Sequence, residues 1–475
     1  MAHKDIQARS VGPELARVLP NDGIPWYRKR HFLRLNFSLL SFFLLSASDG
    51  YDGTLMNGLQ ALPRWQDFMG NPTGAWLGFV NAVQNLSAFV LYPVVAWCND
   101  RFGRKTTLGI NFFWLALAVA LQTAATNPIM FVLGRLFVGA SASFTSGSAP
   151  ILMAEAAYPT HRGIITALFM CGWHVGALLA AWVTFGTRNA PANWSWRIPS
   201  LHQCAVPILA FPGFIMAPKS PRWLASQERV EEARAFLIKH HAGGDENSPL
   251  ADFELQEIVS SLALESQYRK SSSWIDLFRG RGNRHRSFIS VTLAFGITSV
   301  TNLTMISGFL QLWNLILSVG AAFNVDRFGR RPLFLVSSIG MLCAYIIISG
   351  LSGSFAQADI ASVGTAVIPF LFIYYGFYDI AFTPLLVSTR VALSFNTFVN
   401  PNILDAIAWK YYIVYCVILV IITVAIWFWY PETNGYTLEE MVVVFDGDKG
   451  AGSKAMESPA EDKTVKSDIS HVERV

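Results

Sequence analysis

The chain has 475 residues, of which 52% are hydrophobic and only 14% are charged, and its mean hydropathy is +0.37. Ordinary soluble domains are less apolar, so the composition indicates a protein embedded in a lipid bilayer. The net charge of +4 is small, and the basic residues lie between apolar runs, which argues against a nucleic-acid partner. These charges are expected to determine the orientation of the helices in the membrane.

The amino-terminal element is expected to be a cytosolic segment over residues 1–32, because it lacks the apolar core of a signal peptide. Five basic residues crowd around the start of the first apolar run: Arg28, Lys29, Arg30, His31 and Arg34. The positive-inside rule then directs the first helix from the cytosol outward.

Six apolar runs predict an amino-terminal bundle over residues 33–217, since each approaches the ~20 residues that a spanning helix needs. They lie at 33–56, 74–97, 107–125, 128–150, 164–185 and 199–217. Six crossings return the chain to the cytosol. The charged residues 218–286 then predict a cytosolic linker with amphipathic helices at 230–241 and 253–268.

A carboxyl-terminal bundle is expected over residues 287–430, followed by a polar cytosolic tail at 431–475. Its apolar runs lie at 287–325, 332–352, 362–387, 391–407 and 408–430. The string DRFGRK at 100–105 returns as DRFGRR at 326–331, each time between two apolar stretches. Such an internal repeat of membrane segments is typical of secondary transporters, although a coincidental basic loop is the alternative.

Several ordered motifs across residues 45–440 resemble the sugar porters of the major facilitator superfamily, especially the fungal lactose-permease and hexose-transporter-like branch. They are GYDG at 50–53, the two DRFGR loops, GRLFVG at 134–139, YPTHRG at 158–163, AAWVTFGTRN from Ala180, WSWRIPSLHQ from Trp194, SPRWL from Ser220 and PETNGYTLEE from Pro431. The resemblance implies an all-α membrane protein with the major facilitator fold. Its two pseudo-symmetric bundles, nominally of twelve spans, would expose a solute alternately to each side.

The chain departs from this family at three places. Met170 stands where the family carries a polar sugar contact, and about one span of family sequence is missing near 293–297. A second gap near 387–391 removes the expected partners of the carboxyl-terminal loop. The run 287–325 reaches only about 58 Å as a helix, against about 60 Å for two crossings. We therefore expect about 11 full spans, with helix 7 truncated.

The repeated loop predicts a cytosolic gate, because an acid, a glycine and two cations allow a sharp turn and pairing with neighbouring charges. In the amino-terminal half the gate would comprise Asp100, Arg104, Glu155 and Arg162. In the carboxyl-terminal half it would comprise Asp326 and Arg330. The alternative is that these charges only set the topology.

Asp52 lies inside an apolar helix, where a carboxylate is costly to bury and therefore a functional candidate. Arg135 is its expected partner, because helix geometry brings both to the outer half of the membrane. The resemblance implies that this pair couples a proton to sugar movement. Asp49 competes with Asp52 for this role, and a purely structural ion pair is the alternative.

Sugar binding needs hydrogen-bonding groups and aromatic faces inside the bundle. The candidates are Trp173, His174, Gln311, Asn314, Asp379 and Asn396, with Trp313 and Asn400 beside them. The resemblance implies a sugar contact for Asn314 in particular. Each could instead only hold neighbouring helices together. His174 could relay protons, or it could be a core histidine whose hydrogen bonds are all made within the protein.

The sequence thus predicts a monomeric sugar transporter for a disaccharide or hexose, proton-coupled, in the plasma membrane with both termini cytosolic. A sugar sensor, a transport-defective paralogue and a mis-spliced gene product remain as alternatives. No metal, cofactor or nucleic acid is expected: the five cysteines show no paired or metal-binding spacing. The absence of a nucleotide loop or a nucleophile beside a base argues against an enzyme.

Overall fold

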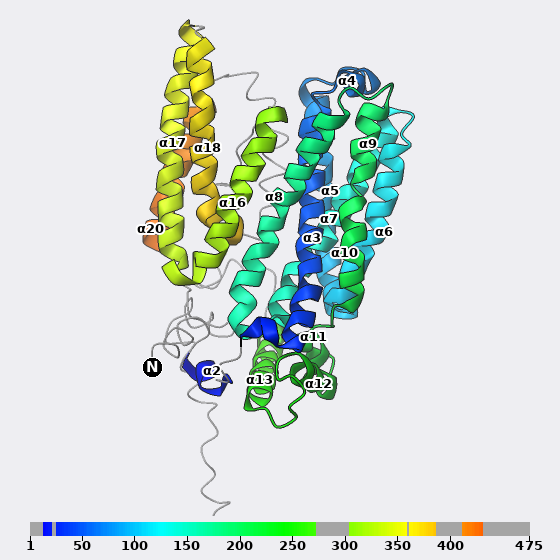
Figure 1. Cartoon of the computed structure of the whole chain (residues 1–475), viewed down its shortest axis with the longest axis vertical. Coiled ribbons are helices and arrows are strands. Elements are labelled where there is room, and N and C mark those ends of the chain that lie inside the picture. The colour runs from blue at the N-terminus through cyan, green and yellow to red at the C-terminus, as the bar shows by residue number, and fades with distance from the viewer. Residues whose placement is uncertain (1–12, 21–24, 272–303, 359–360, 386–410, 431–475) are drawn as a thin grey trace, which may run out of the picture.

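The computed structural model describes residues 13–20, 25–271, 304–358, 361–385 and 411–430. Every regular element in that part of the chain is a helix. The long helices stand in two groups, and a layer of shorter helices lies at one end (Figure 1).

The larger group contains the amino-terminal helices, in which α3 packs on α8, α10 and α7, while α7 packs on α5 and α6. Its members are α3 (Arg30–Leu59), α5 (Gly74–Phe102), α6 (Arg104–Thr123), α7 (Pro128–Ala156), α8 (Arg162–Thr187), α9 (Trp194–His202) and α10 (Ala205–Met216). The short α4 (Pro63–Met69) lies at the end opposite the layer of shorter helices (Figure 1).

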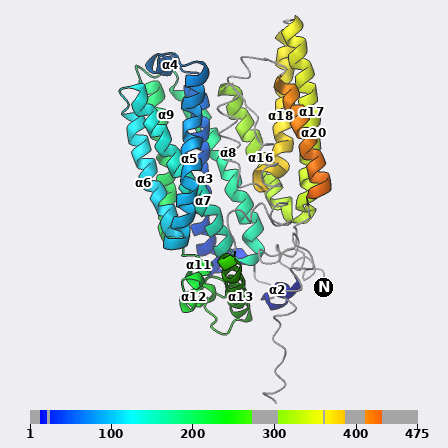
Figure 2. The same ribbon diagram turned by 180° about the vertical axis from the view of Figure 1, so that it is seen from behind.

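The smaller group contains the carboxyl-terminal helices α16 (Thr304–Phe328), α17 (Arg330–Ala358), α18 (Ala361–Leu385) and α20 (Tyr411–Trp429). α17 packs on α18 and α20, whereas α16 leans from α18 toward α8 (Figures 1 and 2). Small side chains allow this approach, since Ala167 and Cys171 of α8 pack with Ala322 of α16. The contact between α8 and α16 joins the two groups.

Six of the described helical segments are long and apolar enough to cross a membrane: Gly74–Phe102, Arg104–Thr123, Pro128–Ala156, Pro159–Thr187, Trp194–Met216 and Arg330–Phe355. α16, α18 and α20 contribute shorter apolar stretches. α3 runs the length of the bundle beside them (Figure 1) and carries Asp49 and Asp52 in its buried part. The polypeptide is therefore an integral, multi-pass membrane protein.

The sixth expected span differs from the prediction, because it begins at Trp194 rather than at residue 199 and is interrupted between α9 and α10. Pro207 lacks the N–H that would donate to the carbonyl of Gln203, so this turn has one main-chain hydrogen bond fewer than a regular helix. The part of the expected run 287–325 up to residue 303 and the whole expected run 391–407 lie outside the described residues.

The layer of shorter helices comprises α2 (Pro13–Val18), α11 (Pro221–Ser226), α12 (Val230–His240) and α13 (Pro249–Ser271). Phe236 and Leu237 on α12 join the apolar core beneath the end of α7. His241 fixes this position, since its Nδ1 lies 2.7 Å from Glu254 Oε2 and its Nε2 lies 3.3 Å from the carbonyl oxygen of Ala156. The layer is thus anchored to α7.

The neighbouring His240 has a lowered pKa of about 4. Burial is the largest cause, followed by the charges of Lys239, His241 and His31.

α3 and α8 cross with their main chains in contact. A Cβ atom on Gly176 of α8 would lie 1.6 Å from the carbonyl oxygen of Ala47, and one on Gly50 of α3 would lie 2.0 Å from the carbonyl oxygen of Trp173. No side chain fits at either position. Small residues of this kind permit close helix packing in membranes, where lipid tails remove the hydrophobic drive for association.

We therefore expect Gly176→Ala to destabilise the protein by about 1–3 kcal/mol, because the added methyl group overpacks the crossing. The measurement is the thermal unfolding of purified protein in detergent. Gly186→Ala is the matched control, since Gly186 lies on the same helix and a methyl group added there would meet no atom within 4 Å. Equal melting temperatures for the two variants would contradict the packing argument.

Candidate functional site

Four of the predicted sugar-binding residues meet where α8 contacts α16 and α18. His174 Nδ1 lies 3.0 Å from Gln311 Oε1, and His174 Nε2 lies 3.2 Å from Asp379 Oδ1. With its amide nitrogen turned toward Asp379, Asn314 donates to Asp379 Oδ2 at 3.1 Å and to the carbonyl oxygen of Leu310 at 3.0 Å. We call His174, Gln311, Asn314 and Asp379 the central cluster.

The central cluster is enclosed by protein. The exposed fractions are 0% for Asp379, 1% for Asn314 and 6% for His174. A polar group in a bilayer must find its partner within the protein, and here the partners come from different groups of helices. The cluster therefore links the two groups through hydrogen-bonding side chains that can also serve a polyhydroxylated solute.

The other predicted sugar contacts lie elsewhere. The ring of Trp173 packs on α3, where a Cβ on Gly53 would lie 2.5 Å from the indole Cη2, so Trp173 fills a helix crossing. Trp313 Nε1 donates to the carbonyl oxygen of Phe372 at 2.9 Å and ties α16 to α18. Met170 packs against the apolar core of the amino-terminal group. Asn396 and Asn400 lie outside the described residues.

Asp52 and Arg135 are adjacent, as predicted, but their contact differs from the expected one. Arg135 Nη1 donates to the main-chain carbonyl oxygen of Asp52 at 3.1 Å. The carboxylate Oδ1 accepts instead from Gln203 Nε2 at 2.9 Å. Both residues are buried, and Asp49, the competing candidate, is buried as well.

Three glutamines that the sequence reasoning missed complete this second polar site. Arg135 Nη2 donates to Gln84 Oε1, and Gln122 Nε2 donates to Gln203 Oε1 at 3.1 Å. All three amides are buried. Gln84 and Gln122 were visible as amides inside apolar runs, which is the signal that also singled out Asp52. All of these contacts lie within the amino-terminal group.

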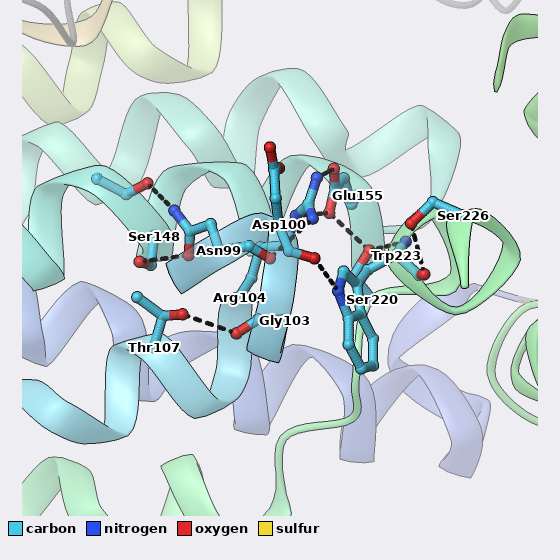
Figure 3. A network of polar contacts seen from close by, with 11 residues as sticks. Asn99, Asp100, Gly103, Arg104, Thr107, Ser148, Glu155, Ser220, Trp223 and Ser226 are labelled. Carbon is cyan, nitrogen blue, oxygen red and sulfur yellow. Dashed lines mark hydrogen bonds and ion pairs between the residues drawn. The ribbon is translucent and has the colours of Figure 1, made fainter. Parts of the chain in front are cut away.

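Several residues expected in the cytosolic gate lie around an ion pair between α6 and α7, which also contacts Ser220 at the start of α11 (Figure 3). Arg104 Nη2 lies 3.1 Å from Glu155 Oε1, and Arg104 Nε lies 3.1 Å from Glu155 Oε2. Ser220 Oγ donates to Glu155 Oε2 at 2.6 Å, and Trp223 Nε1 donates to the carbonyl oxygen of Asp100 at 3.1 Å. Ser220 and Trp223, from the SPRWL motif, belong to the same network of contacts, and the sequence reasoning did not assign them to it.

Arg162 was also expected in the gate cluster, but among the described residues Glu155 forms its ion pair with Arg104. Asn99, the residue before Asp100, bonds to α7. Its Nδ2 donates to the carbonyl oxygen of Gly147 at 2.9 Å, and its Oδ1 accepts from Ser148 Oγ at 2.8 Å. These bonds fix α5 against α7. The ion pair is therefore supported by a hydrogen-bonded network rather than by a second arginine.

The two repeated loops share their geometry. Gly103 and Gly329 have φ values of 86° and 82°, a region that favours glycine. The cation that ends each loop reaches the last helix of its own group: Lys105 Nζ donates to the carbonyl oxygen of Ile215 at 2.9 Å, and Arg331 Nη2 donates to that of Trp427 at 2.7 Å. Arg330 begins α17 and Asp326 lies in the last turn of α16, with a side chain outside the described part.

The protein has two groups of membrane helices, each group carries the same loop, and a polar cluster lies where the groups meet. This arrangement is that of a carrier of the major facilitator class. The solved proton:xylose symporter XylE, from E. coli, has this fold: it superposes with a TM-score of 0.68 at 20% identity, covering 86% of this chain and 99% of that chain.

The family described as "Sugar (and other) transporter" matches residues 39–308 and 296–394. The chain is also 25% identical over 451 residues to a high-affinity glucose transporter of Kluyveromyces lactis, covering 82% of this chain and 81% of the relative. It is 24% identical over 503 residues to the sugar transporter STL1 of Saccharomyces cerevisiae, covering 93% and 86% respectively. The chain belongs to this sugar transporter family.

We expect Glu155→Gln to lower the free energy of unfolding by about 1–3 kcal/mol, because it leaves the largely buried Arg104 without its counter-charge. Thermal unfolding in detergent measures the loss. Glu232→Gln is the control, because Glu232 forms a similar two-point pair with Arg229 on the exposed surface, where such pairs contribute about 0–1 kcal/mol. Equal losses in the two variants would refute the stabilising role of the ion pair between Arg104 and Glu155.

Proposed function

We propose that the protein transports a sugar across the membrane by alternating access, with the central cluster at the substrate site. The observation that carries this proposal is the burial of His174, Asn314 and Asp379, with the half-buried Gln311 beside them, at the contact between the two helix groups. A solute held there would be exposed to one side or the other as the groups rock. Amide and carboxylate groups suit sugar hydroxyls, which both donate and accept hydrogen bonds.

The proposed substrate is a hexose or a disaccharide. Family membership supports a sugar, and the relatives are named as glucose and sugar transporters. These relatives are carriers rather than enzymes, which supports a non-enzymatic role. The proposed setting is the plasma membrane, with a monomeric protein whose termini and gate lie on the cytosolic side, as the basic residues at 28–34 favour.

The proposed mechanism couples sugar movement to a proton through Asp52 and Arg135. Arg135 holds the main chain of Asp52, and the carboxylate has its own hydrogen-bond donor in Gln203. A buried carboxylate beside a buried guanidinium can gain or lose a proton when their environment changes. The fold that this chain shares with a protein named as a proton:xylose symporter supports the proposal.

Uptake of labelled glucose and lactose by yeast cells that lack their own sugar transporters tests the function. We expect saturable uptake of one of the two sugars, and a loss of about tenfold or more in kcat/KM for Asn314→Ala, since the site then leaves a sugar hydroxyl without its partner. Surface expression is measured in parallel. Full surface expression without uptake or exchange of either sugar would refute transport of these sugars.

A second candidate function is that of a chain that no longer transports. It is favoured by the family match, which comes in two pieces that overlap at 296–308 and end at residue 394. These breaks fall at or near both gaps found in the sequence. The uptake experiment separates the candidates, because a transport-defective chain would reach the surface without carrying sugar.

For coupling, we expect Asp52→Asn to reduce sugar accumulation against a gradient by about tenfold or more while preserving exchange of labelled for unlabelled sugar. The amide oxygen can still accept from Gln203 Nε2, but the amide carries no charge and does not take up a proton. Asp49→Asn serves as the comparison, because Asp49 lies one helical turn away on the same helix. If Asp49→Asn alone removes accumulation, the coupling carboxylate is Asp49 and the assignment to Asp52 is wrong.

A further inference from the structure

One face of α3, close to its start, carries exposed apolar and basic side chains at helical spacing. Leu33, Phe37 and Leu40 are 44%, 56% and 53% exposed, and Arg30 and Arg34 are exposed as well. Residues three or four positions apart share one side of a helix. We call these five residues the α3 strip. Along about 15 Å of helix, it passes from two cations to apolar side chains.

The α3 strip faces away from the core of the amino-terminal group. α3 stands between α8 and α10 (Figure 1). α8 meets α3 at the main chain of Phe43 and Ala47, whereas α10 meets it at Ser41, where a Cβ on Gly213 would lie 2.7 Å from the Cβ of Ser41. At about 100° per residue, the apolar side chains of the strip fall between these two lines of contact. In this membrane protein, they therefore face lipid.

The two cations of the strip have no acidic partner. In the described part of the chain, no ion pair or side-chain hydrogen bond involves Arg30 or Arg34. Their Cβ atoms are about 5–6 Å apart, because the residues are four positions apart on one helix. Two guanidinium groups at this spacing can bind the oxygens of one phosphate, an anion whose geometry arginine matches. The positive-inside rule explains a positive charge on this side of the membrane, but not its placement on the lipid-facing side of α3.

The start of α8 adds a third cation beside the strip. The ring of His161 lies 6.1 Å from that of Phe32, so the next residue, Arg162, lies at the level where the strip begins. The Nε of Arg162 is buried and has no hydrogen-bond partner among the described residues. Trp26, whose ring lies 5.5 Å from that of His161, and Tyr27 are exposed just before α3. Exposed aromatic residues of this kind are typical of the headgroup level of a bilayer.

We propose that the α3 strip binds an anionic phospholipid from the leaflet that borders the layer of shorter helices. The phosphate lies between Arg30 and Arg34, and one acyl chain follows Leu33, Phe37 and Leu40. The length of the strip matches one leaflet, which is half of the ~30 Å hydrocarbon core. A soluble phosphate would use only the cations and leave the apolar side chains without a role, so the strip favours a lipid.

The test uses purified full-length protein in detergent, stripped of its own lipid, and counts bound lipids by native mass spectrometry. Phosphatidylserine and phosphatidylcholine with the same acyl chains are added in equal amounts, so that the contacts of the chains cancel. We expect the wild type to retain phosphatidylserine in about 25-fold excess, since each of the two cations contributes a factor of about five toward an anionic lipid. The Arg30→Gln, Arg34→Gln double variant should lose this excess.

The single variants Arg30→Gln and Arg34→Gln should each lower the excess about fivefold, so the test does not depend on the folding of the double variant. The matched control is the Arg229→Gln, Arg234→Gln double variant. It removes the same charge from the layer of shorter helices, where both arginines pair with carboxylates. This control should retain the full excess, and a large excess of inorganic phosphate should leave the bound lipid in place.

Equal retention of the two lipids by the wild type overturns the proposal, as does an unchanged excess in the single and double strip variants. An equal loss in the control variant also overturns it, because the preference would then follow net charge rather than the strip. Displacement of the lipid by inorganic phosphate overturns the choice of a lipid and makes the strip a site for a soluble anion. None of these measurements uses sugar, so their outcome is independent of the proposed transport.

Discussion

The contact between α8 and α16 is the interaction on which the rest of the structure depends. Lipid provides no hydrogen-bond partner, so polar side chains at the centre of the membrane are stable only where the protein supplies one. His174 can be buried because α16 and α18 place Gln311 and Asp379 beside it. The small side chains of Ala167 and Ala322 bring the helices close enough for these contacts. One packing contact thus joins the two groups and creates a polar site between them.

The fold followed from the sequence because the length of an apolar run determines a membrane helix. The runs predicted at 128–150 and 164–185 correspond to α7 and α8, whose ends extend a few residues further. Polar residues inside such runs, such as His174 and Asp379, were recognisable for the same reason. The repeated DRFGR loop indicated the two-fold design, since each copy joins two apolar runs.

The partners of these polar residues could not be predicted as well, because a helix that is apolar on all sides does not reveal its rotation about its own axis. Trp173 and His174 are adjacent in sequence but about 100° apart around the helix, and they face α3 and α16 respectively. Likewise, the sequence indicated that Arg135 and Asp52 are near each other. It could not indicate that the guanidinium binds the main chain and leaves the carboxylate to Gln203.

The main-chain contact between α3 and α8 has a mechanical consequence. At Gly50 and Gly176 there is no side-chain layer between the two backbones, so neither helix can rotate or slide past the other without overlap of atoms. α8 consequently moves as part of a rigid body with α3. Any shear between the halves has to run along the opposite surface of α8, where side chains can change rotamer and take up the displacement.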